Sequence, residues 1–136
     1  MYEELTKFIP LLQTDNFGEW VANKNDDISE RPIHFLVVHY SDIVIQFTDA
    51  VYQFIDEHPE FGLGRYRDIL ISSGIEWELE AMQHADVEKL DGITLMALLV
   101  GAVRAERFSE GALLAFYKNG SITKWIYRLK EIDQER

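Results

Sequence analysis

The feature that most constrains the fold of this chain is an apolar segment, GITLMALLVGAVRAERF, at residues 92–108. From Ile93 to Val103 the segment is apolar on nearly every side of a helix, and a helix that is hydrophobic all round is normally buried. Asp91 precedes the segment and can cap its first turn by accepting a hydrogen bond from an unpaired backbone N–H group. The segment therefore predicts a central helix over about residues 92–107, which the rest of the chain must cover.

Helical periodicity also marks most of the remaining chain. Ser41 can cap a helix over residues 42–58, and a shorter helix over about 65–73 is closed by Gly74 as a left-handed C-cap. Gly101 lies inside the central helix, where glycine costs about 1 kcal/mol relative to alanine, so we expect another element to cross closely there. A further helix is predicted over residues 3–13, with Pro10 as a kink, and another from Ser109 and Glu110 to about Lys118. Ser121 is expected to cap the last helix, whose apolar stripe consists of Ile122, Trp125, Ile126, Leu129 and Ile132.

One short extended segment interrupts this helical pattern. The polar stretch ANKNDDISE at residues 22–30 predicts a loop, and the β-branched and aromatic residues that follow favour an extended segment near residues 33–40. A lone strand cannot form a sheet. The expected fold is therefore all-α, a compact bundle of about five to seven helices around the buried central helix, in a single domain over residues 1–136.

Charge and composition exclude several classes of function. The net charge of −11 disfavours nucleic-acid binding, which depends on lysine and arginine at phosphates. Acids dominate residues 1–100, whereas residues 101–136 carry a net charge of +2, so anion chemistry is best sought near the C-terminus. The chain has no cysteine, its start lacks the pattern of a signal peptide, and its longest apolar run is too short to span a membrane. We expect a cytoplasmic protein without membrane contact.

The last third of the chain carries a resemblance to a known family. Residues 85–132, ADVEKLDGITLMALLVGAVRAERFSEGALLAFYKNGSITKWIYRLKEI, combine an acidic helix start, an apolar helix that ends in R-x-x-R-F-x-x-G, and a closing helix that contains R-L-K. The segments VVHYSDIVIQFTDAVYQF and RYRDILISSGIEW match weaker signatures upstream. The chain thus resembles a family of uncharacterised bacterial proteins catalogued as a domain of unknown function. The resemblance implies a single domain and names no substrate, cofactor or partner.

Patterns for metal and nucleophilic chemistry are missing from the sequence. None of the four histidines forms an i, i+4 ligand pair with another, and only His84 and Asp86 with Glu80 could meet at a helix junction. We therefore expect no metal site and no cofactor. No Gly-x-Ser-x-Gly or Ser-x-x-Lys motif is present, and Ser41, Ser109 and Ser121 are interpreted as helix caps. Paired carboxylates remain open among Asp56, Glu57, Glu76, Glu78 and Glu80.

The charged end of the central helix has two interpretations. Arg104 and Arg107 are i, i+3 neighbours that could clamp a phosphate or carboxylate, with Glu106 as a base. Lys124 and Arg128 on the final helix could add charge to this anion-binding site. In the structural alternative, Arg104, Glu106 and Arg107 fasten the helix junction to an acid such as Asp49, Asp56 or Glu76, while Phe108 returns to the core.

Two functional hypotheses follow from these patterns. The first is a non-enzymatic protein-binding or adaptor module, whose acidic surface suggests a basic partner and whose self-association is equally open. The second is an enzyme or ligand-binding domain for an anionic small molecule that uses the Arg104 and Arg107 region. The aromatic residues are expected mainly in the core, with the lining of a small-molecule pocket as the alternative: Phe17, Trp20, Phe108, Phe116, Tyr117, Trp125 and Tyr127.

Overall fold

A central helix organises the computed structural model, which describes residues 1–22 and 36–135. Helix α6 (Gly92–Ala105) is buried without interruption from Thr94 to Val103. Asp91 caps it by accepting a hydrogen bond of 2.8 Å from the backbone N–H of Thr94. The predicted central helix is thus confirmed, although it ends at Ala105 rather than near residue 107.

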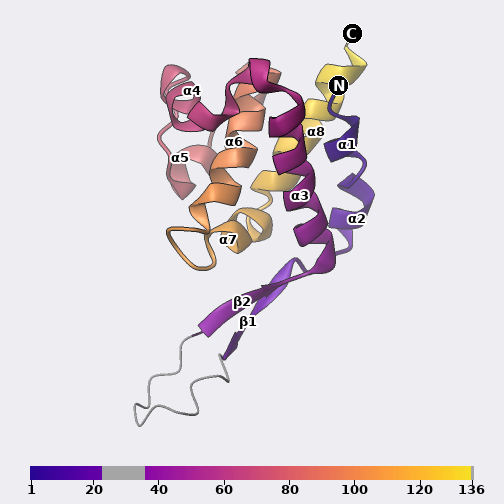
Figure 1. The fold of residues 1–136 in the computed structure, drawn as a ribbon, viewed down its shortest axis with the longest axis vertical. Helices are drawn as coiled ribbons and strands as arrows, with labels where there is room; N and C mark the ends of the chain where they lie inside the picture. The colour runs from indigo at the N-terminus through magenta and orange to yellow at the C-terminus, as the bar shows by residue number, and fades with distance from the viewer. Residues whose placement is uncertain (23–35, 136) are drawn as a thin grey trace.

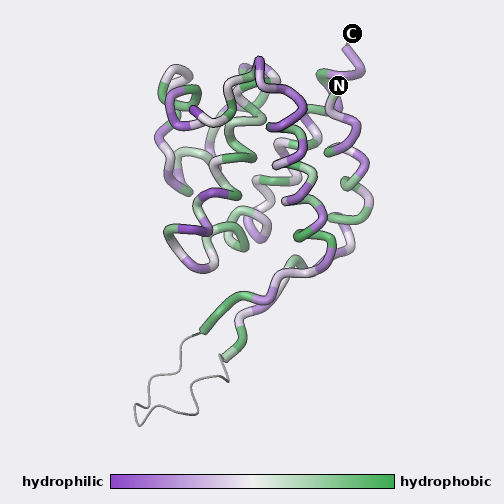
Figure 2. The backbone as a smooth tube through the Cα atoms, viewed as in Figure 1, coloured by the Kyte–Doolittle hydropathy of each residue, from purple (hydrophilic) through white to green (hydrophobic). Residues whose placement is uncertain are grey.

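Longer helices surround α6 and bury their apolar faces against it (Figure 1). These are α3 (Asp42–Glu57), α4 (Tyr66–Ser72), α7 (Ala112–Lys118) and α8 (Ser121–Gln134). Figure 2 shows hydrophobic residues along much of α6 and hydrophilic residues on stretches of the outer helices. The predicted stripe of α8 is buried at Ile122, Trp125, Ile126 and Leu129 and partly buried at Ile132.

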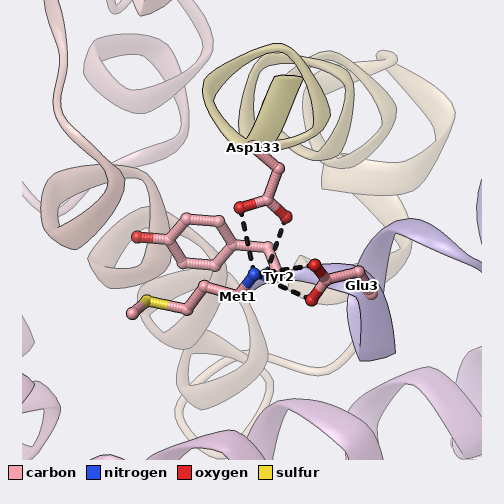
Figure 3. A network of polar contacts seen from close by, with 4 residues as sticks. All are labelled: Met1, Tyr2, Glu3 and Asp133. Atoms are coloured by element: carbon pink, nitrogen blue, oxygen red, sulfur yellow. Dashed lines mark hydrogen bonds and ion pairs between the residues drawn. The ribbon is translucent and has the colours of Figure 1, made fainter. Parts of the chain in front are cut away.

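The N-terminal segment forms two short helices instead of one helix over residues 3–13. Helix α1 (Glu3–Thr6) and helix α2 (Ile9–Gln13) meet at a turn, and Pro10 lies in the first turn of α2. Proline fits there because the N–H groups of a first turn have no intrahelical partner. The carboxylate of Asp133 on α8 accepts hydrogen bonds from the backbone N–H of Tyr2 at 2.8 Å and from the Met1 nitrogen at 3.2 Å (Figure 3). These contacts join α1 to the end of α8.

A two-stranded antiparallel sheet corrects the all-α prediction. Strand β1 (Gly18–Ala22) pairs with strand β2 (Leu36–Tyr40), with Trp20 opposite Val38. The sequence pattern of β1 is weak, because neither face of this short strand is fully buried, so the partner for the expected extended segment was missed. The predicted loop beyond Ala22, and residues 33–35 of the extended segment, lie outside the described residues.

Short helical turns complete the fold between the longer helices. They are η2 (Pro59–Phe61), η3 (Leu63–Arg65), α5 (Leu79–Gln83) and η4 (Val87–Lys89). The predicted caps at Ser41 and Gly74 are confirmed: the Ser41 hydroxyl accepts from Val44 N, and Gly74 is left-handed with φ +77°. Among the described residues, no helix has the length and apolar character that crossing a membrane requires.

Helix α7 begins later than predicted, and helix α8 begins one residue earlier, at Ser121. Ser109 and Glu110 lie in the turn before α7, and Gly111 occupies its N-cap position with φ +88°. Similarly, Gly120 with φ +83° precedes α8, so Ser121 is the first helical residue and its hydroxyl is buried rather than capping. In both turns the chain needs a left-handed residue, which glycine supplies without steric cost. The glycines therefore set these two boundaries.

Candidate functional site

Another segment crosses α6 closely at Gly101. The indole Nε1 of Trp77 donates a hydrogen bond of 3.0 Å to the Gly101 carbonyl. A Cβ at position 101 would lie 3.1 Å from Met82 Cε and 3.3 Å from Trp77 Cδ1, tighter than ordinary van der Waals contact. The predicted close approach is confirmed, and it brings Trp77 and α5 against the last turns of α6.

Glu106 follows α6 and caps the first turn of α7. Its carboxylate accepts hydrogen bonds from Gly111 N at 3.1 Å, from Leu113 N at 3.0 Å and from the Tyr40 hydroxyl at 2.6 Å. The Tyr40 oxygen in turn accepts from Leu114 N at 3.1 Å. Three of the N–H groups at the start of α7 are thus satisfied by two side chains from other elements. These are the contacts of a helix cap, and a role of Glu106 as a base stays a prediction.

The β hairpin is tied to the same loop. Glu110 accepts a hydrogen bond of 2.9 Å from Val38 N, and a Cβ at Gly111 would lie only 2.1 Å from the Trp20 ring. Burial, followed by the hydrogen bond to Glu106, raises the pKa of Tyr40 well above its usual value. The loop over residues 106–111 therefore holds the hairpin on one side of the molecule.

On its other side, the loop over residues 106–111 borders an open groove of about 430 Å³. The groove lies between α5, the end of α6 and α7, and most of its lining is apolar. Met82 and Phe116 are buried beneath it, whereas Trp77 is half-buried and Leu79 is 39% exposed. The phenyl ring of Phe108 is 75% exposed and meets the Trp77 ring edge-on at 5.5 Å between centroids.

The exposure of Phe108 shows that its expected return to the core was wrong. The chain turns outward after Ala105, so the ring stands at the rim of the groove. Glu78 and Glu110 are the charged residues of the lining, which among the described residues contains no cation. The guanidinium of Arg67 lies 4.7 Å from the centre of the Trp77 ring without being part of the lining.

Arg104 and Arg107 face different hollows. Hydrogen bonding to the hydroxyl of Tyr52, and also to that of Tyr66, raises the pKa of Arg104. Arg107 is exposed and lines another hollow together with Tyr40, Asp49 and Glu106. Within the described part of the chain neither arginine forms an ion pair, so the expected attachment to Asp49, Asp56 or Glu76 is not seen.

The other two cations of the predicted anion site contact different elements. Lys124 donates a hydrogen bond of 2.7 Å to the carbonyl of Gln83 at the end of α5. Arg128, whose side chain is 12% exposed, lies 3.2 Å from Glu135 and 3.9 Å from both Glu88 and Glu131. The hydrogen bond to Glu135 raises the pKa of Arg128. Lys124 and Arg128 therefore contact groups of the protein other than the hydroxyls of Tyr52 and Tyr66 beside Arg104.

Histidines and acids do not gather into a metal-ligand set in the described ranges. His84 Nε2 lies 3.5 Å from Glu80, and both side chains are exposed. No group of three or more metal-ligating side chains is found among residues 1–22 and 36–135. Of the junction considered for His84, Asp86 and Glu80, the structure shows one contact between His84 and Glu80, beside a separate pair of Asp86 with Lys89.

The sequence predicted neither the groove nor the hydrogen bonds by which Tyr40 helps to cap α7. One usable signal was the spacing of Glu106, Gly111 and Leu113, because an acid shortly before a glycine and a short helix can cap that helix. The combination of Trp77, Leu79 and Phe108 at one rim had no such signal, since it depends on how α5 packs on α6.

Comparison with known proteins gives one match, over the second half of the chain. Residues 72–135 match DUF6508, a family of unknown function. No curated protein and no solved structure matches the chain. The matched range contains all the residues that line the groove, as well as Arg104 and Arg107, whereas Tyr40 and Tyr52 precede it. The match supports the predicted family type and leaves the activity open.

Proposed function

We propose that the chain is a non-enzymatic protein-binding module whose groove accepts a helical segment of a basic partner. The observation that carries this proposal is the Phe108 ring, 75% exposed at the rim of an apolar groove of about 430 Å³. A single exposed apolar side chain is ordinary, but one that continues into an apolar groove is typical of an interaction site. Trp77 and Leu79 extend this apolar surface.

The position of the groove between helices favours a helix as the occupant. The apolar face of an amphipathic helix binds in grooves between helices through side chains at i, i+3 or i+4, and i+7. The described groove is open, and its lining includes Leu79 of α5, Phe108 and Ala115 of α7, which such anchors would contact. Aromatic residues that become buried on binding are among those that contribute most of the binding energy, which makes Phe108 the expected main contact.

The charge around the groove favours a basic partner. Glu78 and Glu110 are exposed at the groove, whose described lining has no cation, and the whole chain carries a net charge of −11. A partner with lysine or arginine flanking its apolar anchors would be attracted and oriented by this field. An acidic partner, or a second copy of this chain, would be repelled. The bacterial cytoplasm predicted from the sequence is compatible with a chain without cysteine and forms part of this proposal.

Fluorescence anisotropy with labelled synthetic peptides tests the proposal. The first peptide is a helix with leucine at i, i+4 and i+7 and with flanking lysines, and the second carries glutamates in place of the lysines. We expect binding of the basic peptide, weakening of at least about tenfold when Phe108 is changed to serine, and further weakening with salt. Ile71→Ser is the matched control, because Ile71 is 67% exposed on α4 and does not line the groove.

Two outcomes would overturn the proposal. One is equal binding of the basic and acidic peptides, or binding that Phe108→Ser leaves unchanged. The other is self-association: a dimer seen by analytical ultracentrifugation in the wild-type protein and lost in Phe108→Ser would identify a second copy as the occupant.

A further inference from the structure

We infer that Arg104, Tyr52 and Tyr66 form a second binding site, which accepts the carboxylate of a small organic acid with an apolar body. The site lies between α3, α4 and α6, and its residues are distinct from those that line the groove at Phe108. The inference does not depend on the proposed function, and each can fail without the other.

Arg104 has no acidic partner among the described residues. The residue is half-buried, and the phenols of Tyr52 and Tyr66 line the same hollow and raise its pKa. In the described part of the chain no carboxylate lies within 4.0 Å of it, although the protein has 24 aspartates and glutamates. Arg128 shows the usual arrangement, because its largely buried side chain has three carboxylates within 4.0 Å. An arginine that is partly buried beside a hollow and has no anionic partner in the protein is suited to bind an anion.

The space beside the Arg104 side chain suits an apolar molecule. Arg104 borders a hollow of about 210 Å³, and the other lining residues are mainly apolar: Tyr52, Ile55, Leu63, Gly64, Tyr66 and Val100. An anion bound to Arg104 would therefore place the rest of its molecule among aliphatic and aromatic groups. The hollow has room for a short branched chain or a single ring. Guanidinium binds a carboxylate through two parallel hydrogen bonds, and the phenols can donate further ones.

Arg107, which the sequence pairs with Arg104 in a clamp, lines a different hollow. This hollow of about 270 Å³ has Tyr52 in common with the Arg104 hollow, but Arg104 does not line it. Asp49 and Glu106 line the Arg107 hollow too, and their charge opposes a second anionic group. A monocarboxylate at Arg104 fits this distribution of charge better than a nucleotide or another polyanion.

Isothermal titration calorimetry of the full chain with benzoate and isovalerate tests the inference. Inorganic phosphate and benzamide are the comparison probes, the first an anion without an apolar body and the second a ring without a charge. We expect both carboxylates to bind and the comparison probes to bind at least about tenfold more weakly. Arg104→Lys keeps the charge but loses the bidentate geometry, and we expect it to weaken carboxylate binding by about tenfold or more.

Two further variants, Tyr52→Phe and Arg65→Gln, separate a loss of binding from a loss of folding. The first removes one hydroxyl without changing charge and should weaken carboxylate binding by about threefold or more. The second removes the charge of an exposed arginine on the adjoining turn and should leave binding within about twofold. Absence of carboxylate binding, equal binding of phosphate, or affinity unchanged in both Arg104→Lys and Tyr52→Phe would overturn the inference.

Discussion

The Tyr40 hydroxyl donates a hydrogen bond of 2.6 Å to Glu106, and together the two side chains cap the first turn of α7. This contact joins the β hairpin to the end of α6. The loop after Glu106 consequently has two faces, one holding Trp20 of the hairpin and the other carrying Phe108 at the groove. The stability of this loop should therefore decide whether the groove keeps its shape.

Replacement of Glu106 by alanine should lower the free energy of unfolding by about 2–3 kcal/mol. The reason is that the N–H groups of Gly111 and Leu113 and the hydroxyl of Tyr40 all lose their acceptor. Urea denaturation measures the effect, and Glu76→Ala is the control because Glu76 is exposed. A loss for Glu106→Ala no larger than that of the control would contradict the capping role.

Gly111→Ala should destabilise the protein more than Gly120→Ala. Both glycines have a positive φ, so both substitutions introduce strain of about 1 kcal/mol. Only at Gly111 does the added Cβ also meet a neighbour, the Trp20 ring at 2.1 Å, whereas the space around Gly120 is open. We expect an additional loss of about 1–3 kcal/mol at Gly111, measured by urea denaturation. Equal losses would show that the hairpin yields freely at this contact.

Alkaline pH should destabilise the fold through Tyr40. Burial and the bond to Glu106 raise the pKa of Tyr40 in the folded state, and burial raises that of Tyr117. Above a pH of about 10 the unfolded chain releases these phenolic protons while the folded chain keeps them, so stability falls as pH rises. Each such group contributes up to about 1.4 kcal/mol per pH unit. Urea midpoints from pH 8 upward should decline less steeply in Tyr40→Phe than in the wild type, and parallel declines would refute the assignment.

Asp133→Ala should loosen α1 from α8. The side chain of Asp133 is 14% exposed and accepts from Tyr2 N at 2.8 Å, and the substitution removes this hydrogen bond between the two ends of the chain (Figure 3). We expect a loss of about 1–2 kcal/mol and faster hydrogen exchange at the amides of α1. The neighbouring Gln134 is exposed, and Gln134→Ala serves as the control. Unchanged exchange in α1 would contradict this role.

The sequence predicts those parts of the fold that depend on neighbouring residues. The apolar run of α6, the caps at Ser41 and Asp91 and the left-handed Gly74 are local patterns, and the structure confirms each of them. The close crossing at Gly101 is also confirmed. It could be predicted because glycine destabilises a helix interior, so its presence there indicates a close neighbour.

The parts that were missed depend on contacts between distant segments. Strand β1 has no clear alternation of its own and forms by pairing with β2. The outward turn of Phe108 is set by the cap that Glu106 makes with Tyr40, which is 66 residues away. Likewise, the phenols that hold Arg104 come from α3 and α4, whereas the sequence suggested a carboxylate partner. No pattern within a single helix specifies such contacts.

Amide chemical-shift mapping by NMR, with the basic helical peptide titrated into the isotope-labelled protein, tests the central claim most directly. The protein-binding proposal predicts the largest shift changes at Leu79, Phe108 and Ala115 and at the Trp77 indole N–H, which surround the groove. Changes concentrated instead at Trp20 and Leu36 of the hairpin, or spread evenly over the acidic surface, would contradict it.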